Sequence, residues 1–196
     1  MQIKNNNNNT GYTIIETMIA ISLFLVIVTI GLGALLNANA LHKRSQSTRS
    51  IMDNLSFIME DMSRNIRTGS NYYCNSDLAD VKFGYSSSNC PSSNYAIAFE
   101  SSNGDKGNYE DQWGYYIEND GSLRKTINGG ISSLILTPSE IKIDNTSGFT
   151  VVGAESSDTL QPLVTIRLSG TITDVSNGSL IPFSLQTSVS QRLLDR

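Results

Sequence analysis

The sequence predicts an α+β protein in which a long N-terminal helix packs against an antiparallel β-sheet head. Three observations predict this fold. An uncharged apolar run extends from Thr17 to Leu36, apolar residues then recur at helical spacing as far as Ile66, and period-2 patterns follow after residue 70. A chain of 196 residues is long enough for one domain of ordinary size plus an anchor.

The first half of the predicted helix is apolar enough to span a membrane. At about 1.5 Å per residue, the run from Thr17 to Leu36 is roughly 30 Å long, which is the thickness of a bilayer core. Twelve of its 20 residues are Leu, Ile, Val or Phe. At about −0.3 to −0.6 kcal/mol each, these residues favour insertion by on the order of 5 kcal/mol.

The second half of the helix is predicted to be amphipathic. Six apolar residues recur at helical spacing among polar ones: Ile51, Leu55, Ile58, Met59, Met62 and Ile66. Thr68 and Gly69 are expected to end the helix, with Arg64 and Arg67 in its last turn, where cations suit the helix dipole. One helix reaching to about Arg67 would be roughly 85 Å long.

Patterns typical of strands follow. Residues 95–99 are predicted to form a strand, and residues 113–118 and 122–127 flank Asn119-Asp120-Gly121, a sequence typical of a β-hairpin. In residues 164–169, apolar side chains alternate with polar ones, and residues 183–190 show the same pattern except that Thr187 takes one apolar place. This alternation is expected when one face of a sheet is buried and the other is not. We therefore expect one face of the sheet to cover the amphipathic half of the helix.

The residues before the apolar run do not form an ordinary signal peptide. Such a peptide has a basic start, a short apolar segment and a small-residue cleavage site after that segment. Here residues 1–10 are hydrophilic and include an Asn run with no packing value, with Lys4 as their only basic side chain. An uncleaved anchor would account for the apolar run but leaves Glu16, at the mouth of that run, unexplained.

The hexapeptide Gly11-Tyr12-Thr13-Ile14-Ile15-Glu16 and the apolar run behind it resemble the processing motif of type IV prepilins. That motif is a Gly, an aromatic residue, Thr, two aliphatic residues and Glu before about 20 apolar residues. The resemblance implies that a membrane peptidase cuts between Gly11 and Tyr12 and that the new amine of Tyr12 is methylated. It also implies that Glu16 acts in assembly.

This resemblance divides the chain into three parts. Residues 1–11 would be the leader, residues 12–68 the N-terminal helix with residues 12–36 in the membrane, and residues 69–196 a β-rich extracytoplasmic head. The protein would cross the cytoplasmic (inner) membrane once and then enter a filament at the cell surface or in the periplasm. Its implied partners are the prepilin peptidase, other pilins or pseudopilins, and an inner-membrane assembly platform.

Two shorter stretches indicate a branch of the family. Residues 54–69 and 185–192 resemble minor pilins, in particular the J-type pseudopilins of type II secretion. The implied function is that of a structural subunit of a type IV pilus-like or type II secretion filament. The alternative is a single-pass, membrane-anchored extracytoplasmic receptor or adhesin that is not built into a filament.

The charges beside the apolar run favour the opposite orientation. Lys4 and the initial amine precede the run, whereas Lys43, Arg44 and Arg49 follow it, so the positive-inside rule would leave the C-terminal part in the cytosol. A prepilin keeps its N-terminus in the cytosol, and we therefore expect the head to be extracytoplasmic.

The compartment decides the state of the two cysteines, Cys74 and Cys90. An even pair in an exported, loop-rich domain suggests a disulfide, whereas the same pair in the cytosol would suggest free thiols. With the head exported, we expect Cys74 and Cys90 to be bonded.

Composition argues against several other functions. A net charge of −4 and a pI of about 4.9 are unlike the basic balance of nucleic-acid-binding modules. The only histidine, His42, lies just past the apolar run, so the head can build neither a Ser-His-Asp triad nor a His-ligated metal site. No phosphate-binding loop of the right spacing occurs. We expect no catalytic residue, no cofactor and no nucleic-acid partner.

One polar loop holds five oxygen-bearing side chains: Asn103, Asp105, Asn108, Glu110 and Asp111. Such loops bind calcium in some proteins, but this spacing differs from the EF-hand pattern. We interpret the loop as a turn and predict no metal ligand in the chain.

Overall fold

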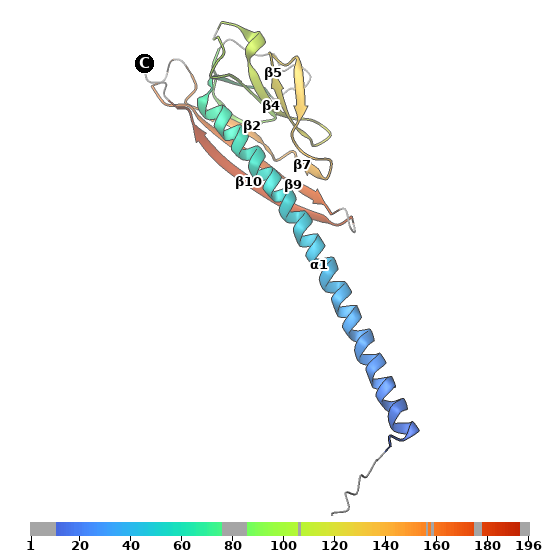
Figure 1. The fold of residues 1–196 in the computed structure, drawn as a ribbon. Helices are drawn as coiled ribbons and strands as arrows, with labels where there is room; N and C mark the ends of the chain where they lie inside the picture. Colours follow the sequence, from blue (N-terminus) through green and yellow to red (C-terminus); the bar gives the residue numbers. More distant parts are fainter. Residues whose placement is uncertain are drawn as a thin grey trace, which may run out of the picture. The chain divides into compact units, whose positions relative to one another are not determined.

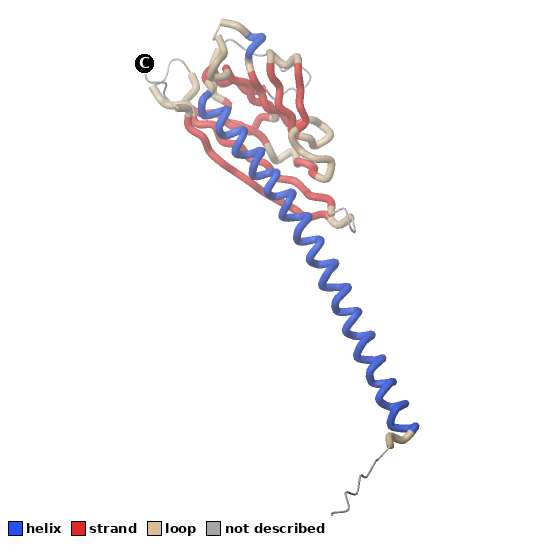
Figure 2. Tube along the Cα trace, in the orientation of Figure 1, coloured by secondary structure: helices blue, strands red, loops and turns tan. Residues whose placement is uncertain are grey.

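The computed structural model describes residues 11–75, 86–105, 107–155, 157, 159–174 and 178–192. In this part of the chain lie one long helix, one 3-10 turn and ten strands, which confirms the α+β fold class (Figures 1 and 2). The chain divides into two compact units, Met1–Gln46 and Ser47–Arg196. All of the strands belong to the second unit.

Helix α1 (Ile14–Thr68) is continuous through both units. In the first unit its side chains are almost all exposed. In the second unit, five apolar residues on one face are buried: Leu55, Ile58, Met59, Met62 and Ile66. These are the positions expected from the helical spacing, and Ile51 at the start of the series is half-buried.

The helix ends where Gly69 meets the first sheet. The Gly69 N–H donates to the carbonyls of Asn65 (3.0 Å) and Ile66 (3.1 Å). A Cβ at position 69 would lie 2.5 Å from a ring carbon of Phe99. Glycine is therefore needed here because Phe99 packs against the backbone, and the left-handed residue of this turn is Asn71, with φ of 55°.

The first sheet is antiparallel and has the strand order β1-β3-β4-β5-β6. Its strands are β1 (Ser70–Asn75), β3 (Ala96–Glu100), β4 (Trp113–Ile117), β5 (Leu123–Ile127) and β6 (Ser132–Ile135). The expected hairpin is β4–β5, in which Ile117 pairs with Leu123 and Gly121 has a φ of 80°. A 3-10 turn, η2 (Tyr109–Asp111), precedes β4.

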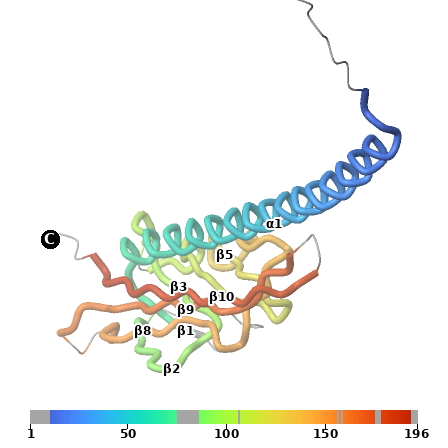
Figure 3. The backbone as a smooth tube through the Cα atoms, turned by 90° about the horizontal axis from the view of Figure 1, so that it is seen from below, coloured from blue at the N-terminus to red at the C-terminus, as the bar shows by residue number. Residues whose placement is uncertain are grey.

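The second sheet is also antiparallel, with the order β10-β9-β8-β2 and β7 paired to β9. Its strands are β2 (Cys90–Asn94), β7 (Ile141–Ile143), β8 (Gly148–Val152), β9 (Leu163–Thr173) and β10 (Leu180–Ser190). In β9 the residues Val164, Ile166 and Leu168 are buried and their neighbours are not, as their alternation predicts. In two perpendicular views, β9 and β10 run beside the second-unit part of α1 (Figures 1 and 3).

The core of the second unit joins the buried face of α1 to both sheets. Phe99 lies at its centre, with ring centroids 6.0 Å from Tyr115 and 6.4 Å from Tyr72. The buried Tyr72 hydroxyl lies 2.7 Å from the carbonyl oxygen of Ile66 and 2.8 Å from that of Gly69, which share its one proton, and burial raises its pKa. Tyr72 thus fastens β1 to the end of the helix.

Candidate functional site

The hexapeptide at residues 11–16 forms the start of α1. The Glu16 N–H donates to the carbonyl of Thr13 (3.1 Å) and lies 3.4 Å from its hydroxyl oxygen. Thr13 is therefore the N-cap and Glu16 the third helical residue, which is the T-x-x-E spacing of a capping box. Sequence reasoning missed the role of Thr13 as the N-cap, although the T-x-x-E spacing is visible in the sequence.

Gly11 and Tyr12 lie outside the helix and are exposed. The side chain of Tyr12 is 83% exposed, and a Cβ built on Gly11 would meet nothing within 4 Å. Packing in the described chain therefore does not require glycine at position 11.

Glu16 is exposed in the first turn of α1, where a carboxylate interacts favourably with the helix dipole. The described residues provide no ion-pair partner for this carboxylate. In the full chain the nitrogen of Tyr12 is a peptide nitrogen, so the amine expected from cleavage does not exist in this form of the protein. Glu16, in the first turn of α1, follows Tyr12 by four residues in the sequence.

The apolar segment behind the hexapeptide is not covered by the protein. Its most apolar 18-residue window has a mean hydropathy of 2.8, and none of that window is buried. Within the described residues, α1 is the one helix long and apolar enough to cross a membrane. Such a surface is far more apolar than a soluble domain normally leaves exposed. Gly31 and Gly33 lie in this segment with nothing within 4 Å of an added Cβ.

The structure joins Cys74 on β1 to Cys90 on β2 in a disulfide, with their Cα atoms 6.1 Å apart. β1 belongs to the first sheet and β2 to the second. The bond therefore links the two sheets directly, in addition to closing a chain segment of 16 residues.

Hydrogen bonds from side chains to the main chain hold the described part of the loop between β3 and β4. The Asp111 carboxylate accepts the N–H of Asp105 (2.8 Å), Asp105 accepts that of Gly107 (3.2 Å), and Asn108 accepts that of Glu110 (3.1 Å). These three oxygens accept main-chain N–H groups, whereas the other carboxylate oxygen of Asp111 is buried without a hydrogen-bond partner among the described residues. In the chain as far as it is described, no group of three or more His, Cys, Asp or Glu side chains is arranged to hold a metal ion.

Glu100, at the end of β3, was missed by sequence reasoning. It is 1% exposed, and within the described part of the chain neither of its carboxylate oxygens has a hydrogen-bond partner at 3.5 Å or less. Burial, and then the charge of Asp111 beside it, raise the pKa of Glu100 to about 7. Because every residue of β3 is buried, the strand has no exposed face, and the alternation that would place Glu100 in solvent does not apply.

A family model described as "Prokaryotic N-terminal methylation motif" matches residues 6–32, which include the hexapeptide and most of the apolar run. Comparison of the chain with curated proteins and with solved structures gives no match. The matched motif indicates a type IV prepilin-like protein that is processed by a prepilin peptidase and N-methylated. Together with the exposed apolar helix, it indicates a single-pass membrane anchor.

Proposed function

We propose that this chain is a minor pilin or pseudopilin, a non-catalytic structural subunit of a type IV pilus-like or type II secretion filament. The observation that carries the proposal is the methylation motif at the mouth of an apolar helix that the described part of the chain leaves uncovered. A membrane accounts for the apolar surface before assembly, and the helices of neighbouring subunits account for it afterwards.

In this proposal residues 1–11 are removed, residues 12–36 anchor the chain and the head is extracytoplasmic. Gly11 supports the cleavage site, because packing in the described chain makes no demand for glycine there. A requirement for glycine at that position would then come from the active site of the peptidase. The partners are this peptidase, other pilins or pseudopilins, and the assembly platform of the inner membrane.

Glu16 is assigned to assembly. A carboxylate costs up to about 3 kcal/mol at the centre of a bilayer and less near its edge, so the anchor tolerates Glu16 without explaining its presence. In a filament of staggered helices, Glu16 meets the methylated amine of Tyr12 on a neighbour. An unpaired charge is costly in that dry environment, so the pair determines the register of the two subunits.

The minor-subunit assignment is supported by the two stretches that resemble minor pilins, residues 54–69 and 185–192. They lie side by side in the structure, where the Arg192 N–H donates to the Arg67 carbonyl (2.8 Å). A minor subunit can initiate or cap a filament without repeating along it. Quantitative mass spectrometry of sheared filaments tests this assignment: we expect a low-abundance subunit, and finding this chain as the most abundant pilin would contradict it.

The mature N-terminus separates the proposal from a membrane-anchored receptor or adhesin. We expect the purified membrane protein to begin with methylated Tyr12, and Gly11→Ala to retain the leader. Gly31→Ala is the matched control, since it makes the same change in an open position of the helix and should be cleaved normally. A wild-type protein that retains Met1 would be a plain anchor.

A further inference from the structure

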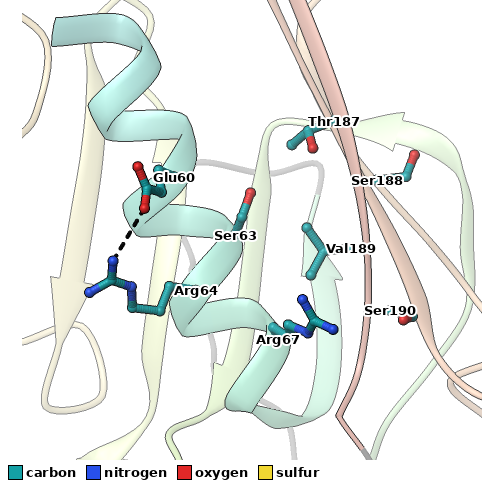
Figure 4. Close-up of a pocket in the computed structure, with 8 residues that line it drawn as sticks. All are labelled: Glu60, Ser63, Arg64, Arg67, Thr187, Ser188, Val189 and Ser190. Atoms are coloured by element: carbon teal, nitrogen blue, oxygen red, sulfur yellow. Dashed lines mark hydrogen bonds and ion pairs between the residues drawn. The ribbon is translucent and has the colours of Figure 1, made fainter. Parts of the chain in front are cut away.

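A groove separates the second-unit part of α1 from β10 (Figure 4). Its volume is about 470 Å³. One wall consists of a stripe along α1, made of Glu60, Ser63, Arg64 and Arg67, and the other wall is residues 187–190 of β10. Both walls are polar except for Val189.

The wall formed by β10 is the outer edge of the second sheet. Side chains of a strand point alternately to opposite faces of the sheet, so four consecutive residues can line one groove only where the groove runs along the edge. β10 is the last strand of its sheet, and β9 is its only partner within the described chain. The groove therefore exposes main-chain groups that no strand pairs.

The register shows which groups these are. Gln191 lies one residue beyond the strand, and its N–H donates to the carbonyl of Pro162, the residue before β9 (3.0 Å). In an antiparallel pair, residues alternate between those bonded to the partner and those that present their main chain to the other side. Counting back from Gln191, Ser188 and Ser190 direct their N–H and C=O groups away from β9 and toward the groove.

A hydrogen bond at the end of the groove agrees with this count. Arg192 has the same parity as Ser188 and Ser190, and its N–H donates to the carbonyl of Arg67 on α1 (2.8 Å). At Arg192 the helix itself thus takes the place of a neighbouring strand. From Ser190 back toward Ser188, the groove separates the two elements, and no other strand of the described residues pairs with this edge.

The charges on the helix wall favour a carboxylate. Glu60 and Arg64 form an ion pair (3.3 Å), but both side chains are at least 70% exposed, so the pair is weak. Arg67 has no ion pair among the described residues, and Arg192, also exposed, lies at the same end of the groove. The walls and this end together carry three arginines and one glutamate.

We propose that this groove binds an extended acidic segment of a neighbouring subunit, which adds as a strand to the free edge of β10 and places a carboxylate at Arg67. Main-chain pairing at Ser188 and Ser190 would supply affinity, and the arginines would select the acidic segment. The identification of the partner as a filament subunit rests on the proposed function. The free edge of β10 and the charge of the groove are observed independently of that proposal.

The edge can be tested without disturbing the rest of the sheet. Ser188→Pro removes an N–H that points away from β9, and an edge strand tolerates proline at such a position. Ser188→Ala is the matched control, because it also removes the hydroxyl that bonds to Thr165 (2.9 Å) but keeps the N–H. Arg67→Glu tests the charge with the strand intact, and Arg49→Glu, on an exposed part of α1, is its control.

The measurement is photo-crosslinking in cells that carry the native partners, with p-benzoylphenylalanine in place of Glu60 of the full-length chain. We expect a crosslink to an Asp- or Glu-containing extended segment of another subunit, identified by peptide sequencing. Ser188→Pro and Arg67→Glu should each reduce its yield at least fivefold, while Ser188→Ala and Arg49→Glu leave it within twofold.

Four results would overturn the inference. The crosslinks could be confined to the same chain, or the crosslinked partner segment could be helical or lack acidic residues. The crosslink yield could be unchanged by either test variant, or no crosslink could form although the chain is recovered in filaments. If Ser188→Pro does not fold, Arg67→Glu decides. Absence of the wild-type chain from filaments would instead contradict the proposed function, while a crosslink to an acidic strand of another membrane protein would leave the groove assignment standing.

Discussion

Asp61 on α1 and Lys125 on β5 join the helix to the first sheet: an oxygen of Asp61 lies 3.3 Å from the Lys125 ammonium. The same oxygen accepts the hydroxyl of Tyr115 (3.2 Å), and this hydroxyl in turn accepts the amide N–H of Asn65 (2.8 Å). Lys125 also lies 4.4 Å from the centroid of the Trp113 ring. One carboxylate thus organises a small polar network at the edge of the core.

Asp61→Asn should destabilise the head by about 1–2 kcal/mol, because it removes the charge that Lys125 and the Tyr115 hydroxyl share in a half-buried site. Denaturant unfolding of the full-length protein in detergent, followed by the fluorescence of Trp113, measures the loss. Asp53→Asn changes an exposed carboxylate on the same helix and should remain within about 0.5 kcal/mol of wild type. Equal effects of the two substitutions would show that the network contributes nothing.

Glu100 should make the stability of the head depend on pH. Burial raises the pKa of Glu100 from 4.5, the value of an exposed carboxyl in the unfolded chain, to about 7 in the folded protein. The folded state therefore binds the proton more tightly, so the contribution to stability is fully present below about pH 4.5 and is lost as the pH rises through 7. The loss is at most about 3 kcal/mol.

Glu100→Gln keeps the shape of the side chain and cannot ionise. We expect it to be more stable than wild type at pH 8 and to lose the decline in stability between pH 5 and pH 8. Glu110→Gln, an exposed change in the same loop, should leave the decline in place. A wild-type protein equally stable at pH 5 and pH 8 would contradict the raised pKa.

The Cys74–Cys90 disulfide should be present in the mature protein and should stabilise it. For a loop of about 15 residues, the entropy of the unfolded chain predicts roughly 3 kcal/mol, less any strain. Mass spectrometry of non-reduced peptides should recover the two cysteine peptides as one species. Alkylation of both thiols without prior reduction would show that the bond is absent, and the Cys74→Ser, Cys90→Ser double variant measures its contribution to unfolding.

Glu16→Gln should sharply reduce recovery of the chain in filaments, while membrane insertion and cleavage at Gly11 stay largely intact. Gln satisfies the capping box as well as Glu does, so this variant removes the charge and retains the start of the helix. Thr13→Ser, which also keeps the cap, is the control and should assemble normally. Wild-type recovery of Glu16→Gln in filaments would show that assembly does not need the charge of Glu16.

Local patterns in the sequence were enough to predict the apolar run, the end of α1, its buried face, the β4–β5 hairpin and the alternation in β9. The start of α1 lies at Ile14 and not at Tyr12 as expected, because Thr13 caps the helix. Each depends on residues close together in the chain: a run of apolar side chains, a helical spacing, a turn sequence or a period of two. The hexapeptide is also local, and the family match confirms the motif from sequence alone.

Other features depend on which distant segments meet, and only the tertiary structure decided them. The sequences of the strands do not predict that they divide into two sheets, and the short strands β2 and β6 lack any alternation of burial. Glu100 is buried because β3 is covered on both faces, and the edge of β10 faces α1 because Arg192 reaches Arg67 across a sequence separation of more than a hundred residues. Sequence by itself determined how each segment prefers to fold and where the apolar run lies. The tertiary structure decided which strand edges, charges and cysteines meet. These contacts join residues that are distant in the sequence, and the local pattern around one residue does not predict its distant partner.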